Sequence, residues 1–412
     1  MAGAATKATA MWVIRRLRRA GFEALLAGGC VRDLLLGARP VDYDVATGAT
    51  PAQVRRLFHR VLLVGAQFGV AMVIHEGRRV EVATFRTDVS YSDGRRPDHV
   101  RFSNPKEDAL RRDFTVNGMF YDPVDQRVID YVGGRQDLRR KVIRTIGEPG
   151  LRFGEDYLRM LRAVRFAVRL GFVIEPASAT AIGQLADRVT RISGERIFDE
   201  LSKMLATARA SEALSLLERH GLARAILPEL WTGAGQPWAQ GCRRVDLVAG
   251  RQDPTLALGA LLGGLERRQI EAVTRRWGCS NPLRHALVFL AGNLNRYGEA
   301  PSMELADFKT LAADGRFGLL VQLWRAQERI DTGSGRAVRA ILRRARAIPA
   351  NRLSPGPLVS GRHLKALGLS EGPLLGRLYR EIHRAQLNEQ VRTHKEAMDL
   401  ARRLVEEAMN QR

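Results

Sequence analysis

The sequence predicts an α+β fold in which a sheet-containing N-terminal unit is followed by helices. Residues 1–140 alternate between apolar repeats of helical spacing and short strand-like runs, whereas the chain from about residue 137 onward is helical almost throughout. At 412 residues the chain is too long for one ordinary hydrophobic core, so we expect several compact units.

The first 140 residues contain the predicted strands. A helix near residues 8–20 precedes the short apolar strand EALLAGG, and a second helix is predicted at VRDLLLG. VDYDV follows as a strand, and PAQVRRLFH begins a helix with proline in its first turn, where proline is favoured. Further strand-like runs are RVLLVG, VAMVIHE and RRVEVATFR. This alternation predicts an α/β or α+β unit built on one sheet.

The rest of the chain is predicted to be helical. EDYLRMLRAVRFAVRL, SGERIFDELSKMLA and SEALSLLERHGLARAI have apolar residues at helical spacing and polar opposite faces. Residues 205–290 resemble a second helical unit in pattern. The proline-rich stretch RAIPANRLSPGP, residues 346–357, predicts a joint, and beyond it Gly372 and Pro373 are expected to start a helix of the tail.

A formal net charge of +22, in which arginine dominates, is the strongest feature of the composition. A basic solvated surface would explain it, but an excess of this size favours a nucleic-acid partner. Cys30, Cys242 and Cys279 are scattered, which argues against disulfides or a zinc site and favours a reducing, cytoplasmic compartment. Because no apolar run approaches the roughly 18 residues that cross a bilayer, we expect no membrane partner.

Asp42 and Asp44 stand two residues apart between Val41, Tyr43 and Val45. In a strand, side chains two apart share a face, so the two carboxylates are expected side by side. Like charges repel each other, and a cation between them would relieve the repulsion. Mg²⁺ is a hard cation that takes oxygen ligands and would fit. The alternative is a pair of exposed aspartates on an edge strand.

Residues upstream of the aspartates favour a nucleotide site. Gly28 and Gly29 of GGCVRD allow a ligand to approach the backbone closely, and Arg32 offers a guanidinium to a triphosphate. Nucleotidyl transfer needs metal ions and reactants positioned in line, so it is the reaction class we expect. Glu81, on a later predicted strand, is equally compatible with orienting the site and with an ordinary surface position.

The segment RRDFTVNGMFYD supplies a second set of candidates. Arg112 and Asn117 are candidates for contact with a triphosphate or a sugar. Asp113 is expected to hold Arg112 in place. By itself this segment is a weak signal, because basic residues beside a strand are common.

The segment EDYLRMLRAVRF supplies the third set. On a helix, Asp156, Arg159, Arg162 and Arg165 would recur every three residues, so each would neighbour the next. A salt-bridged solvent face is one interpretation. The other is base recognition, because an accepting Asp156 and a donating Arg159 match the amino group and ring nitrogen that cytosine and adenine share. Uracil and guanine present a carbonyl there, so such a pair would select C and A without a template.

In this order, GGCVRDLLLG, DYDVAT, RRDFTVNG and EDYLRMLRAVRF resemble the motifs of the tRNA nucleotidyltransferases and bacterial poly(A) polymerases, the class II branch of the polymerase-β-like nucleotidyltransferases. The resemblance covers roughly residues 25–230. It implies a nucleotidyltransferase head with a mixed β-sheet, followed by an all-helical neck, body and tail. The expected ranges are a catalytic head over 1–140, a base-selecting neck over 141–204, a body over 205–290 and a tRNA-binding tail over 291–412.

The resemblance also implies a role for each candidate residue. Asp42 and Asp44 would hold a catalytic Mg²⁺. The nucleotide would be bound by a set of residues from all three segments: Gly29, Arg32 and Arg112 as contacts, Asp156 and Arg159 as base readers, and Arg162 and Arg165 as supports.

The resemblance leaves several reactions open. LLVGAQFGVAMV stands where poly(A) polymerases usually carry a GRRFRL-like string, and RTDVSYSDGRRPDHV, residues 86–100, resembles the flexible loop of A-adding and CCA-adding enzymes. Both favour addition of C, C and A, or the terminal A, to the 3′ end of tRNA from CTP and ATP. The alternatives are a poly(A) polymerase, a CC-adding or A-adding enzyme, and a catalytically silent RNA-binding protein. The oligomeric state stays open.

Overall fold

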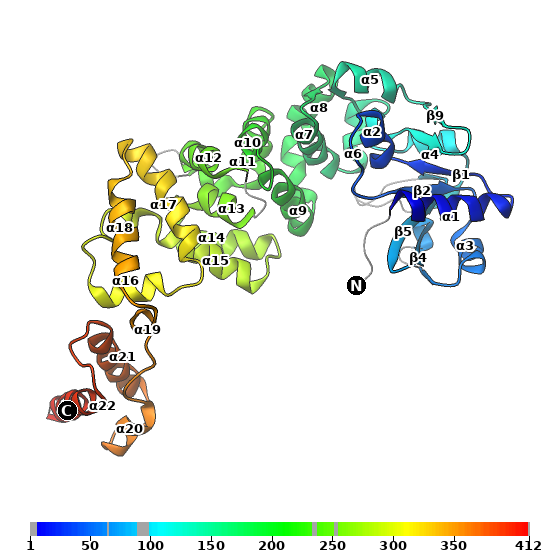
Figure 1. Cartoon of the computed structure of the whole chain (residues 1–412). Helices are drawn as coiled ribbons and strands as arrows, with labels where there is room; N and C mark the ends of the chain where they lie inside the picture. The colour runs from blue at the N-terminus through cyan, green and yellow to red at the C-terminus, as the bar shows by residue number, and fades with distance from the viewer. Residues whose placement is uncertain (1–5, 64–65, 89–98, 233–236, 251–253, 411–412) are drawn as a thin grey trace. The chain divides into compact units, whose positions relative to one another are not determined.

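The computed structural model of the chain describes residues 6–63, 66–88, 99–232, 237–250 and 254–410. It confirms the predicted α+β fold, with an N-terminal mixed sheet followed by helices (Figure 1). The chain divides into two compact units: unit 1 comprises residues 1–233, 249–254 and 273–279, and unit 2 comprises residues 234–248, 255–272 and 280–412. The expected four-part division at residues 140, 204 and 290 stays a prediction.

Within the described residues, unit 1 contains a seven-stranded sheet in the order β3-β4-β5-β2-β1-β8-β9. β2 and β5 are parallel, and the other neighbouring pairs are antiparallel, so the sheet is mixed as expected. The strands are β1 (Ala24–Ala27), β2 (Asp44–Thr47), β3 (Val61–Leu62), β4 (Val70–His75), β5 (Arg78–Thr84), β8 (Phe120–Asp122) and β9 (Arg127–Ile129).

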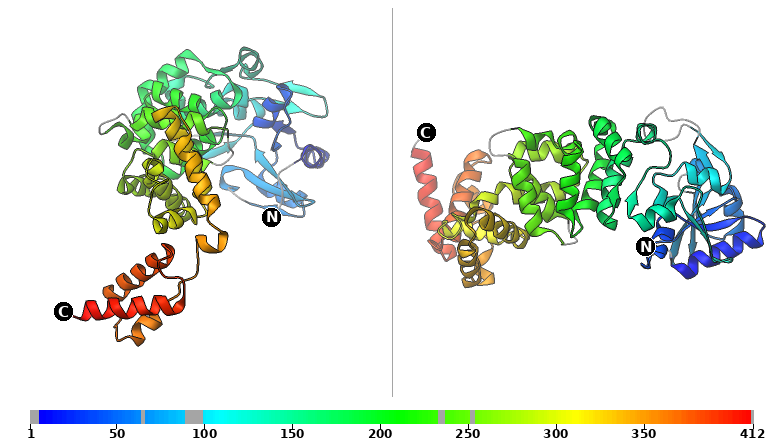
Figure 2. Two further views of the ribbon diagram at one scale, coloured as in Figure 1. Left: turned by 60° about the vertical axis from the view of Figure 1, so that its left-hand side comes forward. Right: turned by 90° about the horizontal axis from the view of Figure 1, so that it is seen from above.

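Short helices join these strands. The predicted helices are present as α1 (Lys7–Arg19), α2 (Gly29–Leu35) and α3 (Pro51–Leu57), and α4 (Pro105–Leu110) follows later in the chain. α1 packs against β1, β2 and β5 and lies along the sheet in Figure 2. Thr50 starts α3 through a reciprocal capping box with Gln53, and Pro51 occupies the first turn as predicted.

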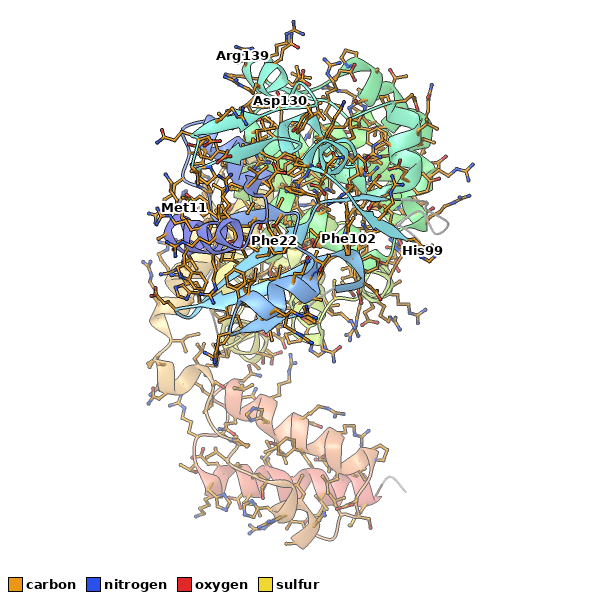
Figure 3. All side chains as sticks on the ribbon, turned by 90° about the vertical axis from the view of Figure 1, so that its right-hand side faces the viewer. Met11, Phe22, His99, Phe102, Asp130 and Arg139 are labelled. Atoms are coloured by element: carbon orange, nitrogen blue, oxygen red, sulfur yellow. The ribbon has the colours of Figure 1, made fainter. Side chains whose placement is uncertain are left out.

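A separate two-stranded ribbon consists of β6 (Arg86–Asp88) and β7 (Val100–Phe102). Figure 3 labels His99 and Phe102 on its second arm. The expected flexible loop spans residues 86–100, and its central residues 89–98 lie outside the described residues. The ribbon packs on α4, and the candidate Arg112 follows the end of this helix.

Helices make up most of the rest of unit 1. The bounds are α5 (Gly134–Arg140), α6 (Pro149–Glu155), α7 (Leu158–Leu170), α8 (Pro176–Leu185), α9 (Gly194–Leu205), α10 (Ala210–Arg219) and α11 (Leu222–Ile226), with a small parallel pair of β10 (Val142–Ile143) and β11 (Val173–Ile174). Gly221 has a positive φ of 75° and separates α10 from α11, which the sequence pattern presented as one run.

The prediction that Asp156 shares a helix with the arginines of EDYLRMLRAVRF is wrong. Asp156 has an extended backbone, with φ −152° and ψ 103°, and lies between α6 and α7. Its Oδ1 accepts the backbone N–H of Leu158 at 3.0 Å, so the side chain caps the first turn of α7. Aspartate competes well for such backbone donors, which explains why the helix starts after it.

Unit 2 is helical in its described residues. The helices are α12 (Pro237–Val248), α13 (Pro254–Leu262), α14 (Arg267–Arg276, whose last turn belongs to unit 1), α15 (Asn281–Gly292), α16 (Leu305–Ala312), α17 (Phe317–Thr332), α18 (Arg336–Ala347), α19 (Ala350–Leu353), α20 (Gly361–Ala366), α21 (Pro373–Leu387) and α22 (His394–Asn410). The predicted joint at 346–357 contains the last two residues of α18 and the short α19, and Gly372 and Pro373 start α21 as expected.

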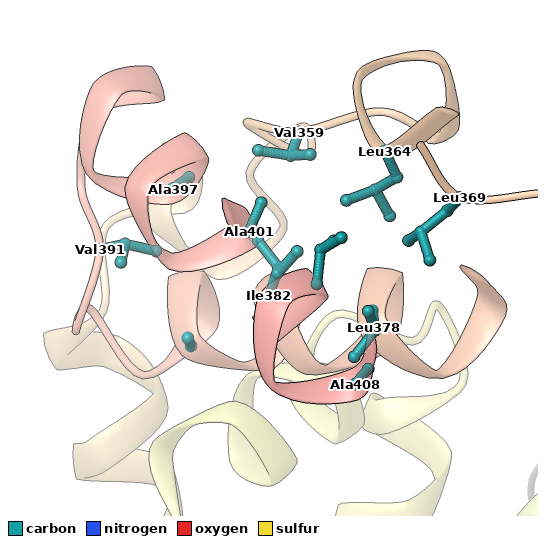
Figure 4. Packing of buried hydrophobic residues seen from close by; sticks show 11 residues of the cluster. Val359, Leu364, Leu369, Leu378, Ile382, Val391, Ala397, Ala401 and Ala408 are labelled. Atoms are coloured by element: carbon teal, nitrogen blue, oxygen red, sulfur yellow. The ribbon is translucent and has the colours of Figure 1, made fainter. Parts of the chain in front are cut away.

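The last three helices of unit 2 share a small core. Figure 4 shows apolar side chains from α20, α21 and α22 packed together, among them Leu364, Leu378, Ile382 and Ala401. Such a core explains why this stretch keeps helical spacing after the proline-rich joint. Across the described parts of both units, no helix is both long and apolar enough to pass through a bilayer.

Candidate active site

A pocket of about 600 Å³ opens in unit 1 beside the β1–α2 turn. Its walls come from β2, β5, the end of α4, α7 and the start of α9. Counted over the described residues, nine arginines and five acidic residues line it: Arg32, Arg86, Arg111, Arg112, Arg159, Arg162, Arg165, Arg169 and Arg196, with Asp44, Glu81, Asp88, Asp113 and Asp156. Such an excess of positive charge in a concave site suits a polyphosphate.

The carboxylates of Asp44 and Glu81 meet on neighbouring strands. In the parallel register of β2 and β5, Val45 pairs with Val82, so Asp44 and Glu81 precede matched positions and share a face of the sheet. Both side chains line the pocket. Glu81, which the sequence left between two interpretations, is therefore part of the pocket wall.

The prediction that Asp42 and Asp44 lie on one strand is wrong in detail. β2 begins at Asp44, whose partner across the sheet is Ala27, the last residue of β1. Beyond Ala27 the chain turns into α2, so β1 offers no partner to Asp42, which is exposed and accepts the backbone N–H of Tyr43 at 2.9 Å. Asp42 nevertheless lies close enough to repel the other two carboxylates.

The repulsion is visible in the proton affinities of these carboxyl groups. Burial, followed by repulsion from Glu81 and Asp42, raises the pKa of Asp44 to about 7, and Arg112 offsets only part of this. Burial and Asp42 also raise the pKa of Glu81. The carboxylates thus provide hard oxygen ligands, and a nearby cation would relieve the repulsion between their negative charges.

These carboxylates fit a divalent cation that is bound jointly by the protein and by the phosphates of the substrate. Among the described residues, no three side chains of the His, Cys, Asp or Glu type form a ready-made metal site. Mg²⁺ is usually bound by one or two carboxylates together with water and substrate phosphates, so an incomplete protein site is compatible with it.

Arg32 is held firmly in the wall of the pocket. Its side chain is 2% exposed, and its Nη1 donates to Asn117 Oδ1 at 2.6 Å while its Nε donates to Asp33 Oδ1 at 2.8 Å. The guanidinium also lies 5.3 Å from the centre of the Phe166 ring. A Cβ atom built at Gly29 would lie 3.6 Å from Arg32 Nη2. Gly29, which was predicted to contact the nucleotide, is therefore a neighbour of this guanidinium.

Arg112 is held by Asp108, not by the predicted Asp113. Asp108 Oδ2 accepts hydrogen bonds from Arg112 Nε at 3.1 Å and Nη2 at 2.9 Å. The expectation failed because Asp108 lies four residues before Arg112, in the last turn of α4, and this spacing brings the two side chains together. Arg112 lines the pocket and lies 5.0 Å over the ring of Phe120.

Asp113 instead holds Arg162 of α7. Its Oδ2 accepts from Arg162 Nη2 at 2.6 Å and Nε at 2.9 Å, while Oδ1 accepts from Asn117 Nδ2 at 3.2 Å. Burial alone would raise the pKa of Asp113, but the charge of Arg162 and these hydrogen bonds bring it below its ordinary value. Asn117 therefore links Asp113 to Arg32, and one network joins α2 to α7.

The two predicted base readers are paired with other residues. Asp156 accepts from Arg196 Nη1 at 3.2 Å and Nη2 at 2.7 Å, and Arg159 Nη1 donates to Glu155 and to the carbonyl of Arg152. Both line the pocket.

Arg165 completes the set on α7. It pairs with the buried Glu200 of α9 and lies 4.1 Å from the centre of the Phe166 ring. Eight of the predicted site residues thus line one pocket, and Asp42 lies beside it.

Several partners in the pocket escaped the sequence-based prediction. Asp108 and Glu155 stand three or four residues before the arginines that they bind, so helical spacing could have revealed them. Arg196 and Glu200 belong to α9, about 40 residues from their partners, and only the packing of α7 on α9 brings them together.

Comparison with known proteins agrees with this geometry. The family model for the poly(A) polymerase head domain matches residues 24–144, and a model described as a probable RNA and SrmB-binding site of polymerase A matches residues 171–233. A CCA-adding enzyme of Geobacillus stearothermophilus is 42% identical over 274 residues, which cover 66% of each chain. Poly(A) polymerase I of Salmonella typhi is 44% identical over 232 residues, which cover 54% of this chain and 50% of the relative.

A solved structure covers more of the chain. The crystal structure of the Bacillus stearothermophilus CCA-adding enzyme in complex with CTP is 33% identical, covers 97% of this chain and 98% of its own, and superposes with a TM-score of 0.72. In the sequence alignments, by contrast, the chain spans about half to two thirds of the length of the curated relatives.

The head-domain match and the sheet with its carboxylates define a nucleotidyltransferase, a class of enzyme that is generally metal-dependent. The chain belongs to the family of tRNA nucleotidyltransferases and bacterial poly(A) polymerases.

Proposed function

We propose that this chain adds C, C and A to the 3′ end of tRNA, using CTP and ATP and no template. One observation carries the proposal: a single pocket of unit 1 joins the carboxylates of β2 and β5 to arginines of α2, α4 and α7. The full-length similarity to a CCA-adding enzyme solved with CTP supports it.

In this proposal Asp42 and Asp44 hold Mg²⁺ next to the triphosphate. The ion, when bound, would neutralise phosphate charge and activate the attacking RNA hydroxyl. The raised pKa of Asp44 supports the assignment, because a bound cation stabilises an ionised carboxyl group most where neighbouring negative charges repel it. Glu81 belongs to the same cluster and would orient it.

The arginines position the nucleotide. Arg32, braced by Asn117 and Asp33, and Arg112, braced by Asp108, present guanidinium groups to the phosphates and sugar, and Gly29 lets them approach the backbone. On the neck side, Arg162 and Arg165 support the nucleotide from α7, each with its own carboxylate partner.

Asp156 and Arg159 would read the base. A carboxylate offers about four acceptor sites, so Asp156 can bind Arg196 and still accept from the amino group of cytosine or adenine. Arg159 would donate to the neighbouring ring nitrogen. Because uracil and guanine lack this pattern, the pair would reject them.

Poly(A) synthesis is the second candidate, since a poly(A) polymerase matches 54% of this chain with similar identity. CC-only and A-only addition are narrower forms of the first. The predicted tail, residues 291–412, would bind a tRNA substrate through its basic α21, and a cytoplasmic location is proposed from the scattered positions of the three cysteines in the sequence.

One experiment separates these functions. Purified protein is given a tRNA ending before CCA, a tRNA ending in CC or an unrelated RNA, with CTP, ATP or both, and the products are sized. Three added nucleotides on the first tRNA support CCA addition, whereas long A tails on any RNA indicate a poly(A) polymerase.

Asp44→Asn should stop incorporation of nucleotides. Asp125→Asn, which changes an exposed aspartate of the predicted head, is the control and should not. Incorporation that persists after removal of divalent metal would contradict the Mg²⁺ assignment.

A further inference from the structure

Asp108 is a buried carboxylate that lies just behind the pocket wall. Its side chain is 2% exposed, and it is not among the residues that line the pocket. A buried charge of this kind is costly unless its hydrogen-bonding capacity is filled. Burial would raise the pKa of Asp108, but Arg112 and Arg111 bring it below its ordinary value, so it stays ionised.

Two successive arginines fill that capacity. Asp108 Oδ1 accepts from Arg111 Nε at 2.8 Å and Nη2 at 2.6 Å, and Oδ2 accepts from Arg112 Nε at 3.1 Å and Nη2 at 2.9 Å. Each guanidinium therefore presents two donors to one carboxylate oxygen, an arrangement that fixes orientation as well as position. Both arginines line the pocket.

The same carboxylate ties these arginines to β6. Asp108 Oδ1 also accepts the backbone N–H of Arg86 at 3.4 Å, and Arg111 Nε donates to the carbonyl of Arg86 at 3.1 Å. Arg152 of α6 donates hydrogen bonds from Nη2 to the carbonyls of Arg111 and Arg112 at 2.6 and 2.8 Å, which fixes the backbone of these two residues. The guanidinium of Arg112 is thus held from its side chain and from its main chain.

We infer that Asp108 is a positioning residue for nucleotide binding, which holds Arg112 toward the nucleotide and couples it through Arg111 to β6. The inference rests on the proposed function, in which Arg112 contacts the nucleotide. A guanidinium that is oriented before the ligand arrives loses little freedom on binding, so its contribution to affinity is larger than that of a mobile one.

The test compares steady-state kinetics of Asp108→Asn with the wild-type chain. The amide keeps the shape of the side chain but cannot pair with two cations, so KM for CTP and for ATP should rise about tenfold, while kcat changes less than about threefold. Asp108→Glu keeps the charge but displaces it by one methylene, and KM should rise by a smaller factor. An unchanged KM in both variants would overturn the inference.

Asp137→Asn is the matched control. Asp137 is also a buried aspartate of unit 1 that accepts from a hydroxyl and a guanidinium, those of Thr115 and Arg144, but it does not line the pocket. This variant should lower the melting temperature and leave KM unchanged. If it raised KM as much as Asp108→Asn does, a general loss of packing would explain both, and the positioning role would be wrong.

A double variant tests the route through Arg112. Asp108→Asn should have no further effect on KM in an Arg112→Gln background, because the residue that it positions is gone. Additive effects would contradict the inference. Two measurements distinguish failure of this inference from failure of the proposed function. If the wild-type chain extends no RNA, the proposed function is wrong. If calorimetric titration with CTP in the absence of RNA gives equal affinities for the wild type and Asp108→Asn, only the inference about Asp108 is wrong.

Discussion

Protonation of Asp44 makes the stability of the folded chain depend on pH. Its pKa of about 7 lies above the ordinary value of 3.8, so the folded chain binds this proton more tightly than the unfolded chain does. The stability that this proton provides is fully present below about pH 4 and is lost as the pH rises through about 7. The raised pKa of Glu81 acts in the same direction.

Without divalent metal, the wild-type chain should therefore melt at a lower temperature at pH 8 than at pH 5. Asp44→Asn removes the charge and should reduce this difference, which calorimetry of both proteins at the two pH values would measure. Adding Mg²⁺ at pH 8 should raise the melting temperature of the wild type more than that of Asp44→Asn, because ligands that bind only the folded state stabilise it. Identical pH and Mg²⁺ responses of the two proteins would contradict the assignment.

Asp156 and Arg159 carry the prediction on base choice. Asp156→Ala or Arg159→Ala should lower the preference for CTP over UTP, expressed as the ratio of kcat/KM values, by about tenfold or more, because a buried polar pattern rejects mismatched partners. Incorporation assays with each of the four nucleotides would measure it. Arg188→Ala, at an exposed arginine of unit 1 outside the pocket, should leave the ratio unchanged. Variants that still select C and A cleanly would refute the base-reading role.

At the scale of elements, the turn from β1 into α2 brings the backbone at Gly28 close to the side chain of Arg112. Gly28 has φ 71° and ψ −130°, and a Cβ there would lie 3.0 Å from Arg112 Nη1. A side chain at this position would meet both an unfavourable backbone conformation and the guanidinium. Gly28, which the sequence marked only as permissive, is thus constrained on two counts.

Gly28→Ala should raise KM for CTP and ATP, because it displaces Arg112, and lower stability by about 1–2 kcal/mol. Gly37→Ala is the control: Gly37 also has a positive φ of 73°, but nothing lies within 4 Å of its Cβ position. It should cost stability without changing KM. Kinetics and thermal unfolding of both variants would decide, and equal KM values would show that the contact with Arg112 has no effect on binding.

Helices and strands that depend on local sequence patterns were predictable, but the residues at which β2 and α7 begin were not. α3 and α21 begin where Pro51 and Pro373 predicted their first turns. β2 is shorter than the strand-forming residues suggested: it begins at Asp44, opposite the last residue of β1. α7 begins after Asp156 because that side chain bonds to the backbone of the next turn. For α7, a side-chain hydrogen bond that the spacing of apolar residues does not reveal determines where the helix begins.

For the whole molecule, a net charge of +22 predicts that RNA binding weakens steeply with salt. Contacts to phosphates release counterions, and about five of them would give a slope of roughly −4 in a plot of log K against log salt concentration. Fluorescence anisotropy of a labelled tRNA across a series of salt concentrations would measure the slope. Binding of free CTP to the same protein is the control and should show a smaller slope. A flat response for tRNA would contradict the phosphate-binding surface.

By itself, the sequence determined the order of sheet and helices, the three charged segments and the kind of ligand that they suit, because these depend on spacing and residue type. Only the tertiary structure decided which charges pair. Asp113 binds Arg162, Asp108 binds Arg112, and Arg196 binds Asp156. Hydrogen bonds and ion pairs act over a few ångströms, and the packing of α7 and α9 brings together side chains that lie dozens of residues apart in the chain.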